Sequence, residues 1–371
     1  MGRRPPVLVK FTRSALVAAA LATCIATATR YASAVEFTPA LQQVIAAADQ
    51  EGGVKVTWPA NSFGGASASQ DIESAMNKMF GTRIKIDYSV GLGPPMLGFR
   101  VLQEMQASHA ASADILIDAA AQVALFDKLG LFDKIDFKSL LPDRIGDEMV
   151  EAEGAALAFA SSSAGILYNT RLSPERPTSL ADMVKPEWKG KIATTPYLAS
   201  FDFLAASDVW GPERAVAYAQ QLSTNIAGLV ECPATDRVIS GEFLAVVMDC
   251  GSQGERREME DGAPIDQVIP TDLAKISYYY YSIPKNSAHK NAARLFAIFM
   301  LTAPGQEILW KYWRGDLHLL PGSREAAWQQ NYTKKYGTAF RIFTVDWYLH
   351  HPEIAPAVKR MQAVLVDNNK K

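Results

Sequence analysis

Residues that can hold a small molecule without reacting with it follow several apolar segments of this 371-residue chain. In parallel sheets flanked by helices, ligands bind at the loops just beyond the carboxyl ends of the strands. Hydroxyls, acids and free backbone N–H groups in such loops suit reversible capture of a polar solute, and aromatic rings there favour a cation or a flat organic body. The candidate ligand-binding residues chosen on this basis are Ser62, Phe63, Gly64, Gly91, Asp118, Ser162, Thr195, Tyr197, Ser200, Phe201 and Asp249.

Familiar catalytic signatures are absent from the sequence. The serine run 161–163 lacks the glycine that precedes the nucleophile in a G-x-S-x-G elbow. Gly91, Gly93 and Gly98 are spaced wrongly for the dinucleotide-binding G-x-G-x-x-G loop, and neither H-E-x-x-H nor G-x-x-x-x-G-K-[ST] occurs. We therefore expect a binding protein, not an enzyme, with no cofactor and no metal site. A secreted enzyme is the alternative, which turnover of a bound compound by the purified protein would establish.

Strand-like and helix-like segments alternate along the chain, which is typical of βαβ units and mostly parallel sheets. The expected strands are Val54–Trp58, Ile84–Tyr88, Asp114–Ile117, Ala156–Ala160, Ile166–Tyr168, Ile192–Thr194, Leu244–Met248 and Ile276–Ile283. The expected helices are Ile72–Phe80, Pro95–His109, Phe201–Val209, Ala292–Leu301 and Glu307–Trp313, with another that begins at Thr38-Pro39. Because the chain is longer than one core usually supports, we expect an α/β protein with two lobes.

The first 34 residues carry the three parts of a secretory signal. A basic leader that ends at Arg13 precedes the uncharged run Ser14–Thr29, and Ala32-Ser33-Ala34 forms a cleavage site. Cleavage after Ala34 would release a soluble periplasmic protein that is net acidic, because the segment removed is basic. The alternatives are an uncleaved anchor and lipoprotein processing at Cys24, where the preceding threonine is bulkier than that processing prefers.

Cys232 and Cys250 are the two cysteines that would remain after this cleavage. An oxidising compartment favours a disulfide between them. Two separate buried thiols are the alternative, because a sequence does not give the Cα separation that a disulfide requires.

A set of blocks from residue 168 onward forms one recognisable pattern, of which the most specific is Pro186-Glu187-Trp188-Lys189-Gly190-Lys191-Ile192. The others, in chain order, are Tyr168–Thr170, Pro177–Met183, Gly241–Val247, Ile283–Lys285, His289–Phe296 and Pro304–Glu307. Together they resemble the iron(III)-type family of periplasmic solute-binding proteins that serve ABC importers. In physical terms these blocks are turns and helix faces, so they indicate the fold and the family rather than the ligand.

The resemblance implies a type II periplasmic binding protein fold with two lobes, each a mixed, mostly parallel sheet flanked by helices. Residues 35–160 and 284–371 would form the first lobe, from which the C-terminal helices can cross, and residues 161–283 the second. A small-molecule ligand would be held between lobes that close about a hinge, and the closed form would engage an ABC permease in the inner membrane. We expect a monomer without a nucleic-acid partner, because the mature chain is acidic. A sensor that feeds a kinase is the alternative to transport.

The chain departs from the iron-binding members of that family after the strand that ends near Met248. Those members place two adjacent tyrosines there, whereas this chain has Met248-Asp249-Cys250-Gly251. Its own tyrosine run, Tyr278–Tyr281, lies in a later strand, whose alternation turns successive tyrosines to opposite faces. No lysine or arginine falls among the candidate residues. We therefore expect an amine, a zwitterion or a phosphonate-like solute, with polyamines and thiamine among the possibilities and ferric ion as the alternative.

Overall fold

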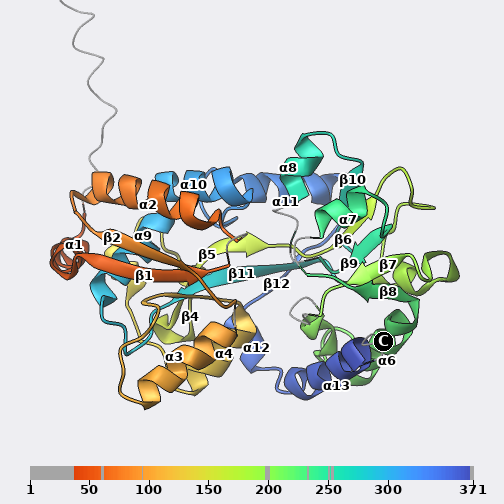
Figure 1. Ribbon diagram of the computed structural model, residues 1–371, viewed down its shortest axis with the longest axis horizontal. Helices are drawn as coiled ribbons and strands as arrows, with labels where there is room; N and C mark the ends of the chain where they lie inside the picture. The colour runs from red at the N-terminus through yellow and green to blue at the C-terminus, as the bar shows by residue number, and fades with distance from the viewer. Residues whose placement is uncertain are drawn as a thin grey trace, which may run out of the picture.

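Two systems of β-strands divide the chain into two lobes that lie end to end (Figure 1). The computed structural model describes residues 37–59, 62–93, 95–196, 201–231, 234–249, 251 and 255–367. The strands are β1 Gly53–Trp58, β2 Lys85–Val90, β3 Leu116–Asp118, β4 Val150–Glu151, β5 Ala156–Ser162, β6 Ile166–Asn169, β7 Ile192–Thr194, β8 Ile226–Leu229, β9 Ala245–Val247, β10 Ile265–Val268, β11 Lys275–Ser282 and β12 Arg341–Phe343. The α-helices are α1 Pro39–Glu51, α2 Gly65–Phe80, α3 Met96–Gln106, α4 Ala120–Lys128, α5 Phe137–Leu140, α6 Pro212–Asn225, α7 Thr235–Ile239, α8 Glu255–Glu260, α9 Lys290–Met300, α10 Ala303–Trp313, α11 Arg324–Tyr336, α12 Val345–Leu349 and α13 Ile354–Asp367.

The first lobe is built around β11, which lies between β3 and β5 and runs antiparallel to both. β1 and β2 pair in parallel, and a bridge between Val56 and Ile115 joins them to the segment that leads into β3. Helices α2 and α10 cover one side of this sheet, and α3 and α4 lie on the other (Figure 1). β1 runs toward the second lobe, so the turn that follows it lies on the side where the lobes meet.

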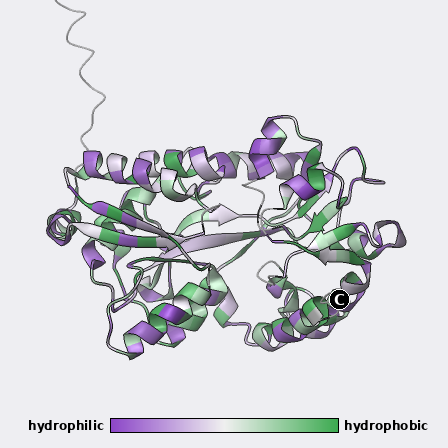
Figure 2. Ribbon diagram, viewed as in Figure 1, coloured by the Kyte–Doolittle hydropathy of each residue, from purple (hydrophilic) through white to green (hydrophobic). Residues whose placement is uncertain are grey.

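The second lobe is a five-stranded sheet in the order β10-β6-β9-β7-β8. β7 pairs in parallel with both β8 and β9, whereas β6 is antiparallel to β9 and β10. In Figure 2 these strands are largely hydrophobic, whereas helices such as α2 alternate between hydrophilic and hydrophobic turns. This pattern is typical of sheets covered on both faces and helices with one face inward. The mixed α/β architecture expected from the sequence is confirmed.

Two connections carry the chain from lobe to lobe and correct the boundaries expected from the sequence. Residues 163–165 join β5 to β6, and residues 269–274 join β10 to β11. β11 pairs with β5 and β3 and therefore belongs to the first lobe, so the boundary expected at residues 283–284 moves back to 269–274. The other boundary moves from residue 160 to 163–165, because β5 stays paired with β11 as far as Ser162.

The C-terminal segment crosses between the lobes a third time. β12 pairs in parallel with the start of β11, and α13 then packs beside α6, with Met361 and Leu365 buried in the second-lobe core. Arg341 forms an ion pair with Asp208 of the second lobe, and Nε2 of His351 lies 3.2 Å from the same carboxylate. Residues beyond 284 are therefore shared between the lobes: α13 packs in the second-lobe core, and Glu325 of α11 forms an ion pair with Arg256 of α8.

Across the described ranges, no helix has both the length and the apolar character needed to cross a bilayer. The expected signal segment, residues 1–34, lies outside the described residues.

Candidate functional site

The turn between β1 and α2 contains three of the candidate residues, Ser62, Phe63 and Gly64. Phe63 and Gly64 have φ angles of 49° and 82°, in the left-handed region that side chains disfavour. A Cβ on Gly64 would lie 2.4 Å from the Cβ of Tyr312 on α10, so this position has room only for glycine. The tight turn sets the position of the Phe63 ring.

Phe63 is one of three aromatic rings that come together from separate parts of the chain. The others are Tyr279 of β11 and Trp313 at the end of α10, and we call the three the aromatic triad. The ring centroids lie 5.5 Å apart for Phe63 and Tyr279, 4.9 Å for Phe63 and Trp313, and 5.5 Å for Tyr279 and Trp313. All three rings are partly buried against the first-lobe core. Aromatic rings in such a group can hold a cation or a flat organic body.

The tyrosines of β11 alternate between two faces of the strand, as the sequence predicts. Tyr281 stacks on Phe159 with a centroid separation of 3.8 Å, on the face that also carries Tyr279. Tyr278 and Tyr280 pack against each other on the opposite face, with centroids 5.9 Å apart. Burial raises the pKa values of Tyr280 and Tyr281 well above their ordinary value. Of the four, only Tyr279 joins the aromatic triad.

Ser162 lies at the end of β5, beside the triad. Its side chain is buried and forms a hydrogen bond with the hydroxyl of Tyr279. Its carbonyl accepts the hydroxyl of Ser277 at 3.5 Å. Ser162 thus links the aromatic triad to the connection at residues 163–165.

Asp249 follows β9 and is held by three hydrogen bonds, one of which comes from the connection at residues 163–165. Its carboxylate accepts the backbone N–H groups of Gly165 and Gly251 and the side-chain amide of Gln267, each at 3.0 Å. The preceding residue, Met248, has a φ of 54° that turns the chain sharply at the strand end. These contacts attach the end of β9 to the first connection between the lobes. A direct contact of Asp249 with a ligand stays a prediction.

Four buried ionisable side chains surround this junction, and we call them the hinge charges. They are Asp202, Asp249 and Glu255 of the second lobe and Lys275 at the start of β11. Burial raises the pKa values of the three acids and lowers that of Lys275, which attracts both Asp202 and Asp249. The Lys275 ammonium also lies 4.4 Å from the ring centroid of Phe203. Three acids with a single base among the hinge charges make this environment favourable to a further cation.

Asp118 ends β3, opposite Tyr280 of β11. Its side chain is buried, and among the described residues its Oδ2 has no hydrogen-bond partner. Burial raises the pKa of Asp118 to about 7. The carboxyl therefore holds its proton in the folded protein at pH values where the unfolded chain has already lost it.

This shift predicts that Asp118 makes the stability of the protein depend on pH. The folded state binds a proton at Asp118 that the unfolded chain has lost. The contribution of Asp118 to the free energy of unfolding therefore falls as pH rises from about 4 to about 7. We expect a loss on the order of 2–4 kcal/mol from this residue. Asp118→Asn should lack that part of the pH dependence in denaturant unfolding at pH 4.5, 6 and 7.5. Asp143→Asn, at an exposed position in the same lobe, should follow the wild type. An Asp118→Asn profile parallel to that of the wild type would contradict this assignment.

The remaining candidate residues that the structure describes are buried or closely packed within the lobes. Phe201 has no exposed surface and packs in the second-lobe core, with its ring centroid 6.5 Å from that of Tyr218. Thr195 is buried just after β7. A Cβ on Gly91 would lie 2.0 Å from a methyl group of Thr57, so this turn is close-packed. Tyr197 and Ser200, and the expected disulfide between Cys232 and Cys250, lie outside the described residues.

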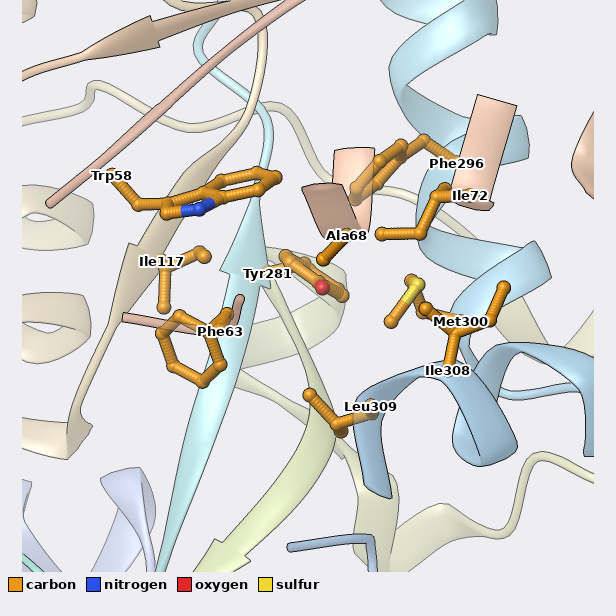
Figure 3. Close-up of a pocket in the computed structure, with 10 residues that line it drawn as sticks. All are labelled: Trp58, Phe63, Ala68, Ile72, Ile117, Tyr281, Phe296, Met300, Ile308 and Leu309. Atoms are coloured by element: carbon orange, nitrogen blue, oxygen red, sulfur yellow. The ribbon is translucent and has the colours of Figure 1, made fainter. Parts of the chain in front are cut away.

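A small pocket borders Phe63 within the first-lobe core (Figure 3). Its volume is about 10 Å³, close to the least that one water molecule needs. Apolar side chains line it: Trp58, Phe63, Ala68, Ile72, Ile117, Tyr281, Phe296, Met300, Ile308 and Leu309. This space is a gap in the packing and not a site for a polar solute.

Sequence reasoning missed four residues that stand out in the structure: Tyr279, Trp313, Glu255 and Lys275. Lys275 had a local signal, because it is the lone charge at the start of the apolar strand β11. The alternation of the tyrosine run placed Tyr279 on one of two faces, without indicating which face borders the other lobe. Trp313 and Glu255 lie on helices and carry no local signal of a binding role.

Comparisons with known proteins agree with this fold. Residues 73–337 match the family of bacterial extracellular solute-binding proteins. The Fe(3+)-binding periplasmic protein of Serratia marcescens is 26% identical over 245 residues, which cover 62% of this chain and 69% of that protein. The apo ferric ion-binding protein A of Pasteurella haemolytica has a TM-score of 0.66 at 15% identity, covering 86% of this chain and 99% of that one.

Two further solved structures carry different ligands in their descriptions. A periplasmic binding protein of Actinobacillus pleuropneumoniae, with fructose-6-phosphate bound, has a TM-score of 0.62 at 18% identity and covers 86% of this chain and 99% of that one. A spermidine/putrescine ABC transporter substrate-binding protein of Streptococcus pneumoniae has a TM-score of 0.58 at 17% identity, with 84% and 99% covered.

The solved structures share the two-lobed fold at identities too low to indicate a ligand, and the family match extends over most of the chain. The resemblance and the fold class expected from the sequence are both confirmed. The chain belongs to the family of bacterial extracellular solute-binding proteins.

Proposed function

We propose that this receptor captures a small organic cation, such as an amine or a quaternary ammonium compound, between its two lobes. It then delivers the cation to the permease of its importer. The junction of the lobes carries the chemistry that such a ligand needs, with aromatic rings on one side and an excess of carboxyl groups on the other.

The observation that carries this proposal is the aromatic triad beside the hinge charges. Phe63, Tyr279 and Trp313 belong to the first lobe, whereas Asp249 and Glu255 belong to the second. Burial raises the pKa of the Tyr279 phenol, and Asp249 and Glu255 are near enough to raise it further when they are ionised. A cation between them would gain attraction to ring faces and to carboxylates at once, in surroundings largely shielded from water.

Ferric ion is a weaker candidate because the side chains that would ligate it are committed elsewhere. Iron(III) prefers anionic oxygen ligands such as carboxylates and phenolates. The Asp249 carboxylate already accepts three protein donors. The phenol beside the site is that of Tyr279, and burial raises its pKa, which disfavours the phenolate that iron(III) would need. These contacts support an organic cation over a metal ion.

A thermal-shift screen of the purified mature protein tests the proposed function. The screen contains putrescine, spermidine, choline and thiamine as cations, with an alkylphosphonate, a dicarboxylate and ferric citrate as the other classes. A ligand that binds only the folded state raises its stability by about 2.7 kcal/mol at a concentration one hundred times its dissociation constant. We expect at least one organic cation to raise the melting temperature. A shift produced by ferric ion or by the anions alone would overturn the proposal.

A further inference from the structure

Glu255, the first residue of α8, is buried in a way that indicates a missing partner. Its side chain is 3% exposed, and within the part of the chain that the structure describes its Oε2 accepts no hydrogen bond. Leaving a buried carboxylate oxygen without a donor costs free energy, because the hydration that it loses is not replaced. The Asp249 carboxylate, in contrast, accepts three hydrogen bonds from protein donors.

The acids around Glu255 make its ionised form more costly. Burial is the main cause, and Asp249 at the end of β9 and Glu258 on the same helix add to it through negative charge. Together they raise the pKa of Glu255 to about 8. The β10 strand, which packs on α8, offers the neutral amide of Gln267 on the Asp249 side. From β11 the nearby ionisable group is the phenol of Tyr279.

The neighbouring cations are committed to other acids and compensate Glu255 only in part. Arg256 is next to it in sequence, but its guanidinium forms a buried ion pair with Glu325 of α11 at 2.6 Å. Lys275 is attracted to Asp202 and Asp249. Arg314, at the end of α10, pairs with Glu260 at 3.1 Å. Each of these cations already has its own acid.

We propose that Glu255 is the counter-ion of the ligand's cationic group and that it releases its proton to solvent when that cation binds. In the empty receptor the carboxyl is neutral, and in the complex the cation takes the place of the proton as the neutralising charge. The O–H bond of the carboxyl breaks, one proton leaves for the buffer, and a carboxylate–cation pair forms opposite the aromatic triad. Each cation that binds therefore displaces one proton, so the affinity for the cation falls as the pH falls. This inference rests on the proposed function and specifies which residue recognises the charge.

Isothermal titration calorimetry in several buffers measures the proton exchange directly. Putrescine, spermidine and choline are titrated into the full mature protein at pH 7 in phosphate, HEPES and Tris. The slope of binding enthalpy against buffer ionisation enthalpy gives the number of protons released. Glu255→Gln keeps the shape of the side chain without its charge. Glu260→Gln, on the exposed side of the same helix, is the matched control.

We expect wild type and Glu260→Gln to release close to one proton per bound cation at pH 7. For Glu255→Gln we expect a release close to zero and an affinity roughly 10- to 100-fold lower, since a charge-assisted contact is lost. Binding without proton release in the wild type, or unchanged release in Glu255→Gln, would overturn the role of Glu255 while leaving the proposed function in place. Failure of these three cations and of thiamine to bind would overturn both, so the two failures are distinguishable. The wild-type proton count is decisive even if a variant folds poorly.

Discussion

A Lys275→Met variant is expected to be about 3–5 kcal/mol less stable than the wild type at pH 8. Lys275 is 2% exposed and is the base that attracts Asp202 and Asp249. Removing its ammonium takes away a positive charge that favours the ionised forms of both buried acids, which costs more than the lost pairing alone. It also removes the contact of the ammonium with the Phe203 ring.

The loss should be smaller at pH 5 than at pH 8. Burial already raises the pKa values of Asp202 and Asp249, and loss of the lysine raises them further, so at low pH both acids are neutral and need no counter-ion. Urea unfolding followed by circular dichroism at both pH values measures the difference. Lys285→Met removes a lysine from an exposed position and should be nearly neutral. Equal stability of Lys275→Met and the wild type at pH 8 would contradict the role given to the hinge charges.

A Trp313→Ala variant is expected to bind the organic cation roughly 30-fold more weakly, which corresponds to about 2 kcal/mol for a desolvated cation–π contact. The centroid of its ring lies within 5.5 Å of the ring centroids of both Phe63 and Tyr279. Truncation therefore also removes packing contacts that position these two rings. Trp313→Phe keeps an aromatic face and should retain most of the affinity.

Titration calorimetry with putrescine, spermidine and choline measures this effect, with unfolding curves to confirm that the variant is folded. Trp210→Ala is the matched control, because Trp210 is also partly buried but packs on Tyr218 in the second lobe. Loss of affinity in Trp210→Ala equal to that in Trp313→Ala would show a general effect of destabilisation. Full affinity in Trp313→Ala would exclude the aromatic triad from the ligand site.

Much of the fold could be predicted because its strands and helices carry local patterns. The apolar alternation of Val54–Trp58 corresponds to β1, and the helix expected at Ala292–Leu301 corresponds to α9. The next helix is expected from Glu307, yet α10 begins at Ala303. The Thr302 hydroxyl accepts the N–H of Gly305, and Pro304 fits the first turn, where no intrahelical donor is needed.

One expected helix was wrong for a reason that lies outside its own sequence. Phe201–Val209 reads as a helix, but the structure has only a short 3₁₀ turn at Asp202–Ala205, after which Ala206 is extended. Phe203 packs against Phe343 of β12, with ring centroids 4.4 Å apart. This contact brings together residues far apart in the chain, and such packing overrides local propensity.

The candidate site was predictable only where its residues follow strands. Phe63 and Asp249 lie in the turns that follow strands β1 and β9, which is the pattern that strand-end reasoning detects. Tyr279, Trp313 and Glu255 reach the same region through the pairing of β11 with β5 and the placement of α8 and α10. Those contacts depend on tertiary structure, and periodicity within any one segment does not reveal them.

The central claim is that the receptor recognises positive charge on an organic solute, and titration against uncharged isosteres tests it most directly. Choline is compared with 3,3-dimethylbutanol, which has the same shape without the charge, and putrescine with 1,4-butanediol. We predict saturable binding of at least one of the two cations, with its isostere at least tenfold weaker. Equal binding of a cation and its isostere, or binding of ferric ion with neither cation bound, would contradict the account.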